Sequence, residues 1–347
     1  MTASTVTDLF LSLTPDKVLE AVEAAGLRCN PVCYPLNSFE NRVYEVELED
    51  RTRVIAKFYR PGRWTRAQIL EEHQFLSDLA DAEVPVCPVL PFPDGETLHT
   101  IDNILYCLFE RRGGRAPDEV TDTLAERLGM LCARIHNVGA SRPAPNRLEL
   151  CADIYIRDNL AWLAESGTIP PHLKTRYFDA ANRIAETADL RMEGVPTHRV
   201  HGDMHLGNLL LRDSVFNVLD FDDMVTGPAV QDLWMLIPGR DTWARRQREA
   251  FIEGYQQLRD FDRSTLTLVE PLRGMRLVHY ATWLAKRWHD PIFPRTWPHF
   301  GTDKYWQEET AELEDIVEQL QVESGEAPAE ESVTLTNKDY FFDWEDN

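Results

Sequence analysis

Three stretches that follow one another without interruption, HGDMHLGN, LLLRDSVFNV and LDFDD, most constrain what this chain can fold into. The middle stretch has two apolar runs on either side of a polar turn, a pattern that predicts an antiparallel hairpin. If the turn is centred near Ser214, residues whose numbers sum to about 428 lie opposite each other, which pairs Asn208 with Asp220. An amide oxygen and a carboxylate at the open end of a hairpin can hold a hard cation such as Mg²⁺, whose other ligands are phosphates and water.

Asp203 lies on the loop that precedes this hairpin and could accept the proton of an attacking hydroxyl group. Protein kinases place a general-base Asp and a metal-binding Asn a short fixed distance apart, and then bring in a second metal-binding Asp. Asp203, Asn208 and Asp220 follow that order, so the sequence predicts a phosphotransferase site with Asp203 and Asp220 as its catalytic carboxylates.

This interpretation has two alternatives. Asp203 and Asn208 could do no more than organise a loop, as Asp and Asn often do. His201, Asp203 and His205 could instead bind zinc, because an H-x-D-x-H run supplies three ligands. The zinc interpretation leaves Asn208 and the hairpin unexplained, and the kinase pattern is favoured for that reason.

Lys57 lies in VIAKFY, the second strand of a hairpin predicted from VYEVELED and RTRVIAKFY. The run is close to the V-A-I-K form in which a strand lysine holds nucleotide phosphates, and a lysine with a solvated head is the alternative. A helix predicted over about residues 65–81 carries Glu72 on its apolar face, where a carboxylate needs a cationic partner. We therefore pair Lys57 with Glu72 in preference to Glu71, whose helical neighbours are less apolar.

No G-x-G-x-x-G run precedes this hairpin and no GxxxxGK[ST] run occurs in the chain, so the turn that covers the phosphates must be LNSFENR. Ser38 and Asn41 could bind phosphate through their side chains, and a tight turn can also do so through backbone N–H groups. An ordinary polar turn before a strand is the alternative. Leu108, Phe109 and Glu110, at the end of NILYCLFE, are expected to form the hinge beneath the adenine.

A chain of 347 residues, of which 43% are hydrophobic, can form two lobes. We predict an α+β, two-lobed, protein-kinase-like fold with a β-rich N-terminal lobe over residues 1–110 and a larger helical C-terminal lobe over 111–321. The boundary follows from the flexible pair Gly113-Gly114. Asp232 is expected to buttress the catalytic loop, or else to cap a helix. Beyond a helical pattern near Leu124 to Ile135, further helices are predicted over about 151–165, 172–189, 229–237, 241–258, 264–288 and 303–321.

The net charge of −22 argues against broad binding to nucleic acids or anionic membranes, which require clustered Lys and Arg. The chain has no apolar run of roughly 20 residues and no export signal at its start, so we expect a cytoplasmic protein. Six scattered cysteines predict reduced thiols rather than a zinc or disulfide framework. The acidic stretch 322–347 is expected to be mostly disordered, with an aromatic cluster that could dock on its own body or on a partner. A monomer is the default.

Several runs of the sequence resemble the bacterial stress response kinase A family, also called RdoA or YihE. They include LNSFENRVYEV, VIAKFYRPGRW, ILEEHQFL, HGDMHLGN, VLDFDD, GPAVQDLWML, PLRGMRLVHYATWLAKRW and DPIFP. The resemblance extends from about residue 5 to about residue 320 and leaves the acidic tail outside. It implies a fold similar to aminoglycoside phosphotransferases and choline kinases, with ATP and Mg²⁺ as cofactors and serine/threonine protein kinase activity in the stressed cytoplasm.

The same resemblance implies Asp203 as the catalytic base, with Asn208 and Asp220 as magnesium ligands. It also implies that Lys57 and Glu72 act on the phosphates and that Ser38–Arg42 form the phosphate loop. At the metal site the chain has Asp220-Phe221-Asp222, whereas protein kinases of the eukaryotic type have Gly third. This difference argues against an activation-loop switch that turns on that Gly, and Asp222 or Asp223 could share in metal binding.

From the sequence we therefore expect transfer of the γ-phosphoryl group of ATP to a Ser or Thr hydroxyl of a protein substrate. A kinase for small alcohols of the aminoglycoside, choline or homoserine type is the alternative, because it needs the same residues. A third hypothesis, a nucleotide-binding scaffold without turnover, conflicts with the intact Lys57, Asp203, Asn208 and Asp220. A closed pocket lined by acidic residues would favour a small cationic acceptor, and an open groove would favour a peptide.

Overall fold

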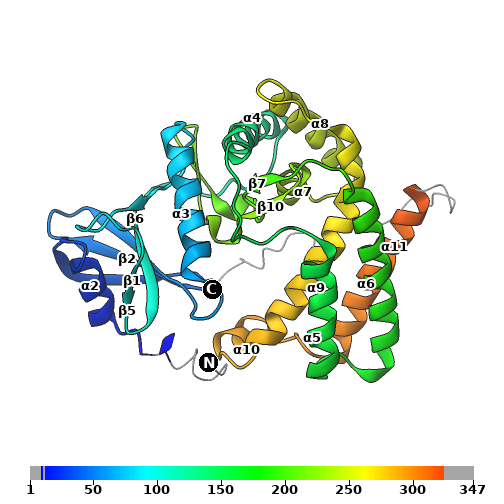
Figure 1. Cartoon of the computed structure of the whole chain (residues 1–347), viewed down its shortest axis with the longest axis horizontal. Helices are drawn as coiled ribbons and strands as arrows, with labels where there is room; N and C mark the ends of the chain where they lie inside the picture. Colours follow the sequence, from blue (N-terminus) through cyan, green and yellow to red (C-terminus); the bar gives the residue numbers. More distant parts are fainter. Residues whose placement is uncertain (1–8, 11, 324–347) are drawn as a thin grey trace. The chain divides into compact units, whose positions relative to one another are not determined.

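The computed structural model describes residues 9, 10 and 12–323, which fold into two compact units (Figure 1). The first unit contains the described residues up to Asp118 together with Ala144–Arg147 and Leu206–Met224. The second unit contains Glu119–Pro143, Leu148–His205 and the described residues from Val225 onward. Neither unit is one continuous piece of chain, and the lobe boundary expected near Gly113 stays a prediction.

Two statements about the ends and the helices complete this outline. Residues 324–347, which carry most of the predicted acidic tail and its aromatic cluster, lie outside the described residues. Among the helices that the structure describes, none combines the length and the apolar character needed to cross a membrane.

The first unit is built on an antiparallel sheet with the strand order β1-β2-β3-β6-β4, in which β5 also pairs with β6. The predicted hairpin is present as β2 and β3, with Val43 opposite Lys57. On its other side Lys57 pairs with Cys107 of β6. The elements are β1 (Cys29–Leu36), β2 (Arg42–Leu48), β3 (Arg53–Phe58), β4 (Val89–Leu90), β5 (His99–Ile101), β6 (Ile104–Glu110), α2 (Pro15–Glu23) and α3 (Arg66–Asp81).

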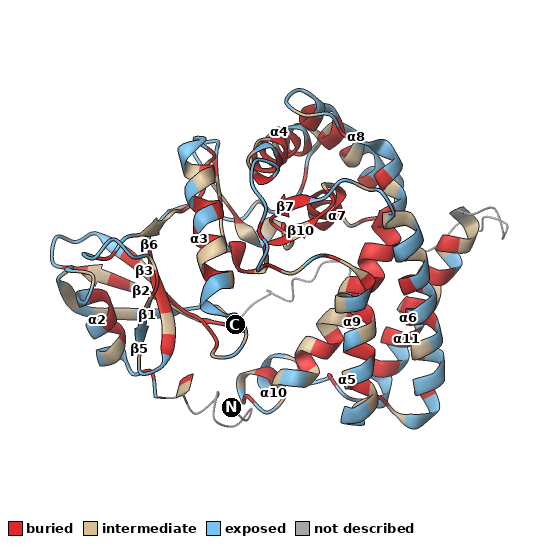
Figure 2. Ribbon diagram, in the orientation of Figure 1, coloured by how far each residue is buried: buried red, intermediate tan, exposed pale blue. Residues whose placement is uncertain are grey.

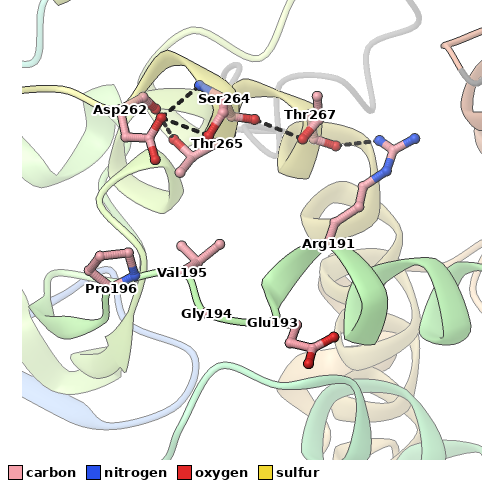
Figure 3. A pocket seen from close by; sticks show the side chains of 9 residues that line it. All are labelled: Arg191, Glu193, Gly194, Val195, Pro196, Asp262, Ser264, Thr265 and Thr267. Atoms are coloured by element: carbon pink, nitrogen blue, oxygen red, sulfur yellow. Dashed lines mark hydrogen bonds between the residues drawn. The ribbon is translucent and has the colours of Figure 1, made fainter.

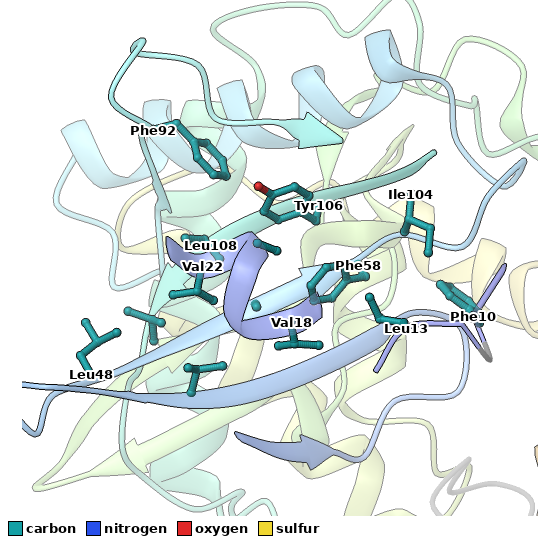
Figure 4. Close-up of a cluster of buried hydrophobic side chains, with 14 residues drawn as sticks. Phe10, Leu13, Val18, Val22, Leu48, Phe58, Phe92, Ile104, Tyr106 and Leu108 are labelled. Carbon is teal, nitrogen blue, oxygen red and sulfur yellow. The ribbon is translucent and has the colours of Figure 1, made fainter. Parts of the chain in front are cut away.

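Helix α2 supplies the apolar core on one face of this sheet (Figure 4). Val18 and Val22 lie four residues apart on the helix, so both point to the same side and reach the sheet. There they join Phe58 and Tyr106, whose rings stack with their centroids 5.4 Å apart. Each fully buried side chain of this kind contributes about 1.5–3 kcal/mol. Because successive strand residues face opposite sides, Phe58 fills this core while Lys57 faces the other side of the sheet.

Helix α3 covers the side of the sheet on which Lys57 lies. It starts with a capping box, in which Thr65 and Gln68 each bind a backbone N–H group of the other. Ile69 of this helix is fully buried in a small cluster that includes Cys107 of β6. The predicted helix over 65–81 is therefore confirmed, and its buried face meets the strand that carries Lys57.

The predicted second hairpin is present as β8 (Leu209–Arg212) and β9 (Val215–Val218), an antiparallel pair. A two-residue turn, Asp213-Ser214, joins the strands, and both residues have positive φ angles of 48° and 65°. Two-residue hairpin turns need this left-handed conformation because its twist matches that of the strands.

The predicted register of this hairpin is wrong by one residue. Leu209 pairs with Val218, and the backbone N–H of Leu219 donates to the carbonyl oxygen of Asn208 over 2.9 Å. The turn contains two residues rather than three, so Asn208 lies opposite Leu219 and not opposite Asp220. Asp220 follows directly, and both metal-ligand candidates remain at the open end of the hairpin.

Contacts with earlier segments hold the hairpin in the first unit. The backbone N–H of Val218 donates to the carbonyl oxygen of Pro85 over 2.8 Å. Leu211 and Arg115 exchange two backbone hydrogen bonds, at 2.8 Å and 3.2 Å. The hairpin is thus fixed to the chain on both sides of β4 and β6.

The second unit is mainly helical, and its helices are buried along the faces that meet (Figure 2). Helix α4 packs on α8, and α6, α9 and α11 run side by side (Figure 1). Its elements are α4 (Asp122–Gly139), α5 (Asp158–Ser166), α6 (Pro171–Met192), β7 (His198–Val200), β10 (Val225–Gly227), α7 (Val230–Leu236), α8 (Thr242–Gln256), α9 (Val269–Arg287), α10 (Ile292–Thr296) and α11 (Asp303–Glu323).

The predicted helices of this unit are confirmed, with two differences. The stretch predicted as one helix over 264–288 begins with a 3-10 segment, Arg263–Leu268, before α9. The short helix α10 lies in a proline-containing stretch where no helix was predicted. The family of fold classes is as expected, α+β with a sheet-containing N-terminal part and a helical C-terminal part.

Two glycines let α4 and α8 approach each other closely. A Cβ atom at Gly129 of α4 would lie 1.9 Å from the carbonyl oxygen of Phe251, and one at Gly254 of α8 would lie 2.0 Å from the carbonyl oxygen of Glu126. No side chain fits at such distances from a backbone atom. The contact matters for the site, because each helix carries a residue that supports the HGD loop.

Candidate active site

Lys57 binds three carboxylates of the first unit. Its ammonium nitrogen lies 3.3 Å from Glu72 Oε1, 3.1 Å from Asp220 Oδ1 and 3.1 Å from Asp222 Oδ1. The predicted pair of Lys57 and Glu72 is therefore confirmed, and both side chains are buried, with 7% and 1% of their surface exposed. Burial alone would lower the pKa of Lys57, but Asp220, Asp222 and Glu72 outweigh it and hold the pKa well above its ordinary value. Lys57 is thus a fixed positive charge.

Glu72 is fixed from behind by its own helix face and by Tyr59. The Tyr59 hydroxyl donates to Glu72 Oε2 over 3.3 Å. Burial raises the pKa of Glu72 to about 7, although Lys57 opposes this shift. The competing candidate, Glu71, has a different task, since it accepts hydrogen bonds from the backbone N–H groups of Asn146 and Arg147 at about 3.0 Å.

Asp220 has the features of a residue held for function. Its φ and ψ angles of 56° and 66° lie in the left-handed region, which costs free energy for any residue other than Gly. Its side chain is 56% exposed even though one oxygen contacts Lys57. Asn208, at the same end of the hairpin, is partly exposed. The two oxygen donors suit a hard divalent cation, so these residues fit a magnesium–nucleotide complex.

Asp222 is engaged by protein groups instead of being presented to a ligand. Arg63 lies 2.5 Å from Asp222 Oδ2, Asn41 donates to the same oxygen over 3.2 Å, and Lys57 contacts the other oxygen. Although burial would raise the pKa of Asp222, Lys57, Arg63 and Arg147 hold it well below its ordinary value. Arg63 also forms an ion pair with Asp223. These contacts tie the segment after Asp220 to the first unit.

The predicted phosphate loop is the turn between β1 and β2. Asn41, at its end, is 3% exposed, and its amide is used within the protein, where its oxygen accepts from the Arg60 backbone N–H over 3.2 Å and its nitrogen donates to Asp222. Ser38 is partly exposed. In this arrangement the backbone and Ser38 face a phosphate more readily than the Asn41 side chain does, and the phosphate-binding role of both residues stays a prediction.

The predicted hinge lies at the end of β6. Leu108 and Phe109 pair with β3 on one side and with β4 on the other, whereas Glu110 pairs only with Val54 of β3. Leu108 is buried, Phe109 is partly buried and Glu110 is exposed. Contact of Phe109 or Glu110 with adenine stays a prediction.

Asp203 belongs to the second unit, where cations surround its carboxylate. Arg276 of α9 lies 2.8 Å from Asp203 Oδ1, and His205 Nε2 lies 3.5 Å from Oδ2. Burial would raise the pKa of Asp203, but Arg276, His205 and His201 together hold it well below its ordinary value. Asp203 is therefore ionised. Its placement beside the residues of the first unit stays a prediction.

Asp232 buttresses the loop that carries Asp203, as expected from the sequence. Its two oxygens accept hydrogen bonds from the backbone N–H groups of His201 and Gly202, both at 2.9 Å. His136 of α4 adds a third contact at 3.0 Å through Nε2, and its other ring nitrogen lies 2.9 Å from the hydroxyl oxygen of Tyr255 on α8. The helix-cap alternative does not hold, because Ala229 is the residue at the start of α7.

Three side chains of the site were not singled out from the sequence, namely Arg63, His136 and Arg276. Arg63 and Arg276 occur in runs that carry no metal or nucleophile signal, and their partners are 159 and 73 positions away in the chain. His136 follows the apolar stripe of α4 directly, which marked the helix but not its polar contact.

The described residues do not support the other ligand sites considered. Within them, no group of three or more His, Cys, Asp and Glu side chains is arranged to hold a metal ion. A pocket of the second unit contains none of the predicted site residues (Figure 3). Its polar groups serve the fold, since Arg191 donates to the Thr267 carbonyl oxygen over 2.5 Å and Asp262 accepts from the Ser264 backbone N–H over 2.9 Å. The pocket is lined by Arg191, Glu193, Gly194, Val195, Pro196, Asp262, Ser264, Thr265 and Thr267.

A lysine on a strand, a glutamate behind it, a carboxylate at a hairpin end and an HGD loop together define the class of protein. Residues 33–268 match the model of the "Phosphotransferase enzyme family", which includes more than half of the chain. The chain therefore belongs to this phosphotransferase family.

Curated relatives narrow the resemblance, as the sequence runs implied. The chain is 40% identical over 315 residues to "Stress response kinase A" of Escherichia coli (strain K12), covering 90% of this chain and 94% of the relative. It is 38% identical over 302 residues to "Serine/threonine protein kinase RdoA" of Salmonella typhimurium (strain LT2), covering 87% of this chain and 92% of the relative. The resemblance to the stress response kinase A family is confirmed.

Solved structures of more distant proteins share the fold. Amicoumacin kinase hAmiN, in complex with AMP-PNP, Ca²⁺ and Ami, matches with a TM-score of 0.70 and 20% identity, over 86% of this chain and 93% of that chain. A microcompartment-associated aminopropanol kinase matches with a TM-score of 0.67 and 20% identity, over 88% and 98%. These likenesses establish the kinase-like fold.

Proposed function

We propose that this protein uses ATP and Mg²⁺ to transfer the γ-phosphoryl group to a Ser or Thr hydroxyl of a protein. The observation that carries the proposal is Lys57, whose ammonium contacts both Glu72 and Asp220. A phosphoryl transferase needs a fixed cation for the phosphates beside a carboxylate for the metal. Here one side chain links the two positions within a single unit.

Each residue of the first unit has a part in holding the nucleotide. Lys57 would bind the phosphates, and Glu72 would keep its ammonium in place. Asn208 and Asp220 would hold Mg²⁺, which when bound neutralises phosphate charge and orients the γ-phosphoryl group. Asp222 keeps this segment in position through Arg63. Asp220 would release Lys57 to the phosphates and turn to the cation.

Asp203 would act on the acceptor. The bond from the hydroxyl oxygen to the γ-phosphorus forms as the bond to the leaving ADP oxygen breaks, and the hydroxyl proton passes to Asp203. The lowered pKa of Asp203 keeps it ionised and ready to accept that proton. Asp232 supports this step by holding the backbone of His201 and Gly202.

The names of the relatives support a protein acceptor. One relative of 38% identity is named a serine/threonine protein kinase. A small-molecule alcohol kinase is the second candidate, because solved structures of the same fold act on amicoumacin and aminopropanol according to their titles. Chemistry does not separate the two, since either acceptor presents a hydroxyl to Asp203.

The test supplies radiolabelled ATP and Mg²⁺ to the full chain, with generic protein substrates in one series and a panel of amino alcohols in another. Asp203→Asn is the matched variant, because it keeps the shape of the side chain and removes its basicity. We expect label on protein that is lost in Asp203→Asn. Label that persists in the variant, or that appears only on an amino alcohol, would refute the proposal.

A further inference from the structure

Helix α9 has an unusual charge for this chain. From Leu272 to His289 it contains no Asp or Glu, whereas the whole protein has a net charge of −22. The same stretch contains four residues that carry a positive charge at neutral pH: Arg273, Arg276, Lys286 and Arg287. The helix is thus a basic element in an acidic protein.

One face of α9 starts at the catalytic base. Arg276 contacts Asp203 at 2.8 Å within the second unit. Tyr280, Trp283 and Arg287 follow at helical spacings of four, seven and eleven residues, so they share the face of Arg276. All four side chains are partly exposed. We call these four residues the α9 face.

The contacts along the α9 face alternate aromatic and cationic groups. The rings of Tyr280 and Trp283 stack with centroids 5.5 Å apart and an interplanar angle of 23°. The Arg287 guanidinium lies 5.4 Å from the centroid of the Trp283 ring. Such a surface offers flat apolar contact between two positive charges, which suits an extended segment with an acidic side chain.

The carboxylates near this helix are mostly compensated. Glu270, the acidic residue at its start, is bound by Arg240 at 2.6 Å and by Arg273 at 3.3 Å. Arg157 pairs with Asp153 and Asp189, at 2.7 Å and 2.5 Å. These include the acidic residues on the π-helical turn and on α6.

Lys286 is a separate case on the edge of the α9 face. It is half-buried, and burial together with Arg287 lowers its pKa, while the nearby Asp158 opposes this shift. Its charge is therefore offset by Asp158. The positive charge of the α9 face rests on Arg276 and Arg287.

Resting on the proposed kinase function, we infer that the α9 face selects the acceptor by charge, favouring a Ser or Thr in an acidic segment and disfavouring cationic amino alcohols. Arg276 neutralises Asp203, so a polycationic acceptor gains no attraction from the base and meets Arg287 as a like charge. Eleven residues of helix span about 16 Å, which is about five residues of extended peptide. The favoured acidic residue is thus about five positions from the acceptor hydroxyl.

The test measures kcat/KM of the full chain for a set of peptides that differ at single positions. Each peptide has one Ser and carries Asp, Asn or Lys five residues before or after it. We expect the Asp peptide in one direction to exceed its Lys counterpart about tenfold at low salt, and the ratio to shrink at high ionic strength. An amino alcohol panel runs alongside.

Charge reversal at the far end of the α9 face gives the matched control. Arg287→Glu should remove or invert the preference for Asp while leaving ATP hydrolysis without acceptor unchanged, because Arg287 lies outside the proposed catalytic machinery. Arg287→Gln, which only removes the charge, should reduce the preference and tests the same point if the reversal impairs folding. Arg245→Glu on α8, a helix that packs on α4, makes the same change of charge and should keep the preference.

The outcomes separate this inference from the function on which it rests. Equal use of Asp and Lys peptides, or preference for Lys, overturns the inference and leaves the protein-kinase proposal standing. A preference for Asp that survives Arg287→Glu and Arg287→Gln also overturns it. Label on amino alcohols with none on any peptide overturns the function itself, and the inference with it.

Discussion

Replacing Gly254 with Ala sets two effects of opposite sign against each other. In a helix interior this change should stabilise by about 0.5–1 kcal/mol, because Ala has less backbone freedom to lose on folding. The new Cβ atom, however, would lie 2.0 Å from the carbonyl oxygen of Glu126 and 2.7 Å from its carbonyl carbon. Carbon and oxygen atoms in favourable contact are about 3.3 Å apart or more, so α8 must move away from α4 by roughly 1 Å.

The packing effect should dominate. Overfilling a packed interface costs about 1–3 kcal/mol, and a rigid backbone obstacle places this case at the upper end. After subtraction of the helix preference we expect a net loss of about 2 kcal/mol. A loss of 1 kcal/mol lowers Tm by about 2–4 °C for a body of 150–250 residues, so Tm should fall by about 4–8 °C.

The assay is thermal and urea unfolding of the full chain, with Glu253→Ala as the control. Glu253 is exposed on the same helix, so its replacement tests a change in helix preference without an obstacle. An unchanged or higher Tm for Gly254→Ala would mean that the packing argument is wrong. The neighbouring Tyr255 reaches His136, so we also expect a lower kcat at temperatures where the variant is folded.

Three further predictions concern the site and its surroundings. Asp220→Ala should abolish Mg²⁺-dependent ATP turnover with little change in Tm, because the side chain is half-exposed, and unaltered turnover would mean that the hairpin does not hold the metal. Asp232→Asn leaves one acceptor oxygen for two backbone N–H groups, so it should cost about 1–3 kcal/mol in urea unfolding and lower kcat more than it changes the KM for ATP; an equal effect on both constants would contradict a role in holding the loop. Burial and Lys57 lower the pKa of His73 from 6.5 to about 3. The unfolded chain therefore takes up the proton first, and stability should fall from pH 6.5 towards pH 3, by about 2 kcal/mol at pH 5. His73→Gln should flatten this slope in urea titrations, and an identical slope would refute the assignment.

The metal-site hairpin shows what sequence patterns can and cannot give. Two apolar runs around a polar turn were enough to predict both strands and to bring Asn208 and Asp220 to one end. They did not give the register, because it depends on whether Asp213 and Ser214 both adopt left-handed conformations. A turn of two residues instead of three then moves every pair by one position.

The pair of Lys57 and Glu72 was predictable for a different reason. A carboxylate on the apolar face of a helix must find a cation, and the strand lysine was the candidate nearest in the chain. Arg63 and Arg276 could not be found in this way, because their carboxylate partners lie far away in the sequence and only the fold brings them together. The same holds for His136, whose partners lie on α7 and α8.

The segment after Asp220 leaves no length for a regulatory insertion. Arg63 pairs with both Asp222 and Asp223, and only Met224 separates the 3-10 turn that ends at Asp223 from the start of β10 at Val225. A kinase that is switched by modification of a long loop at this point spends much of its time with the metal carboxylate misplaced. This chain instead keeps the carboxylate assembled at all times, so its output should follow how much enzyme the cell makes and how much acceptor is present.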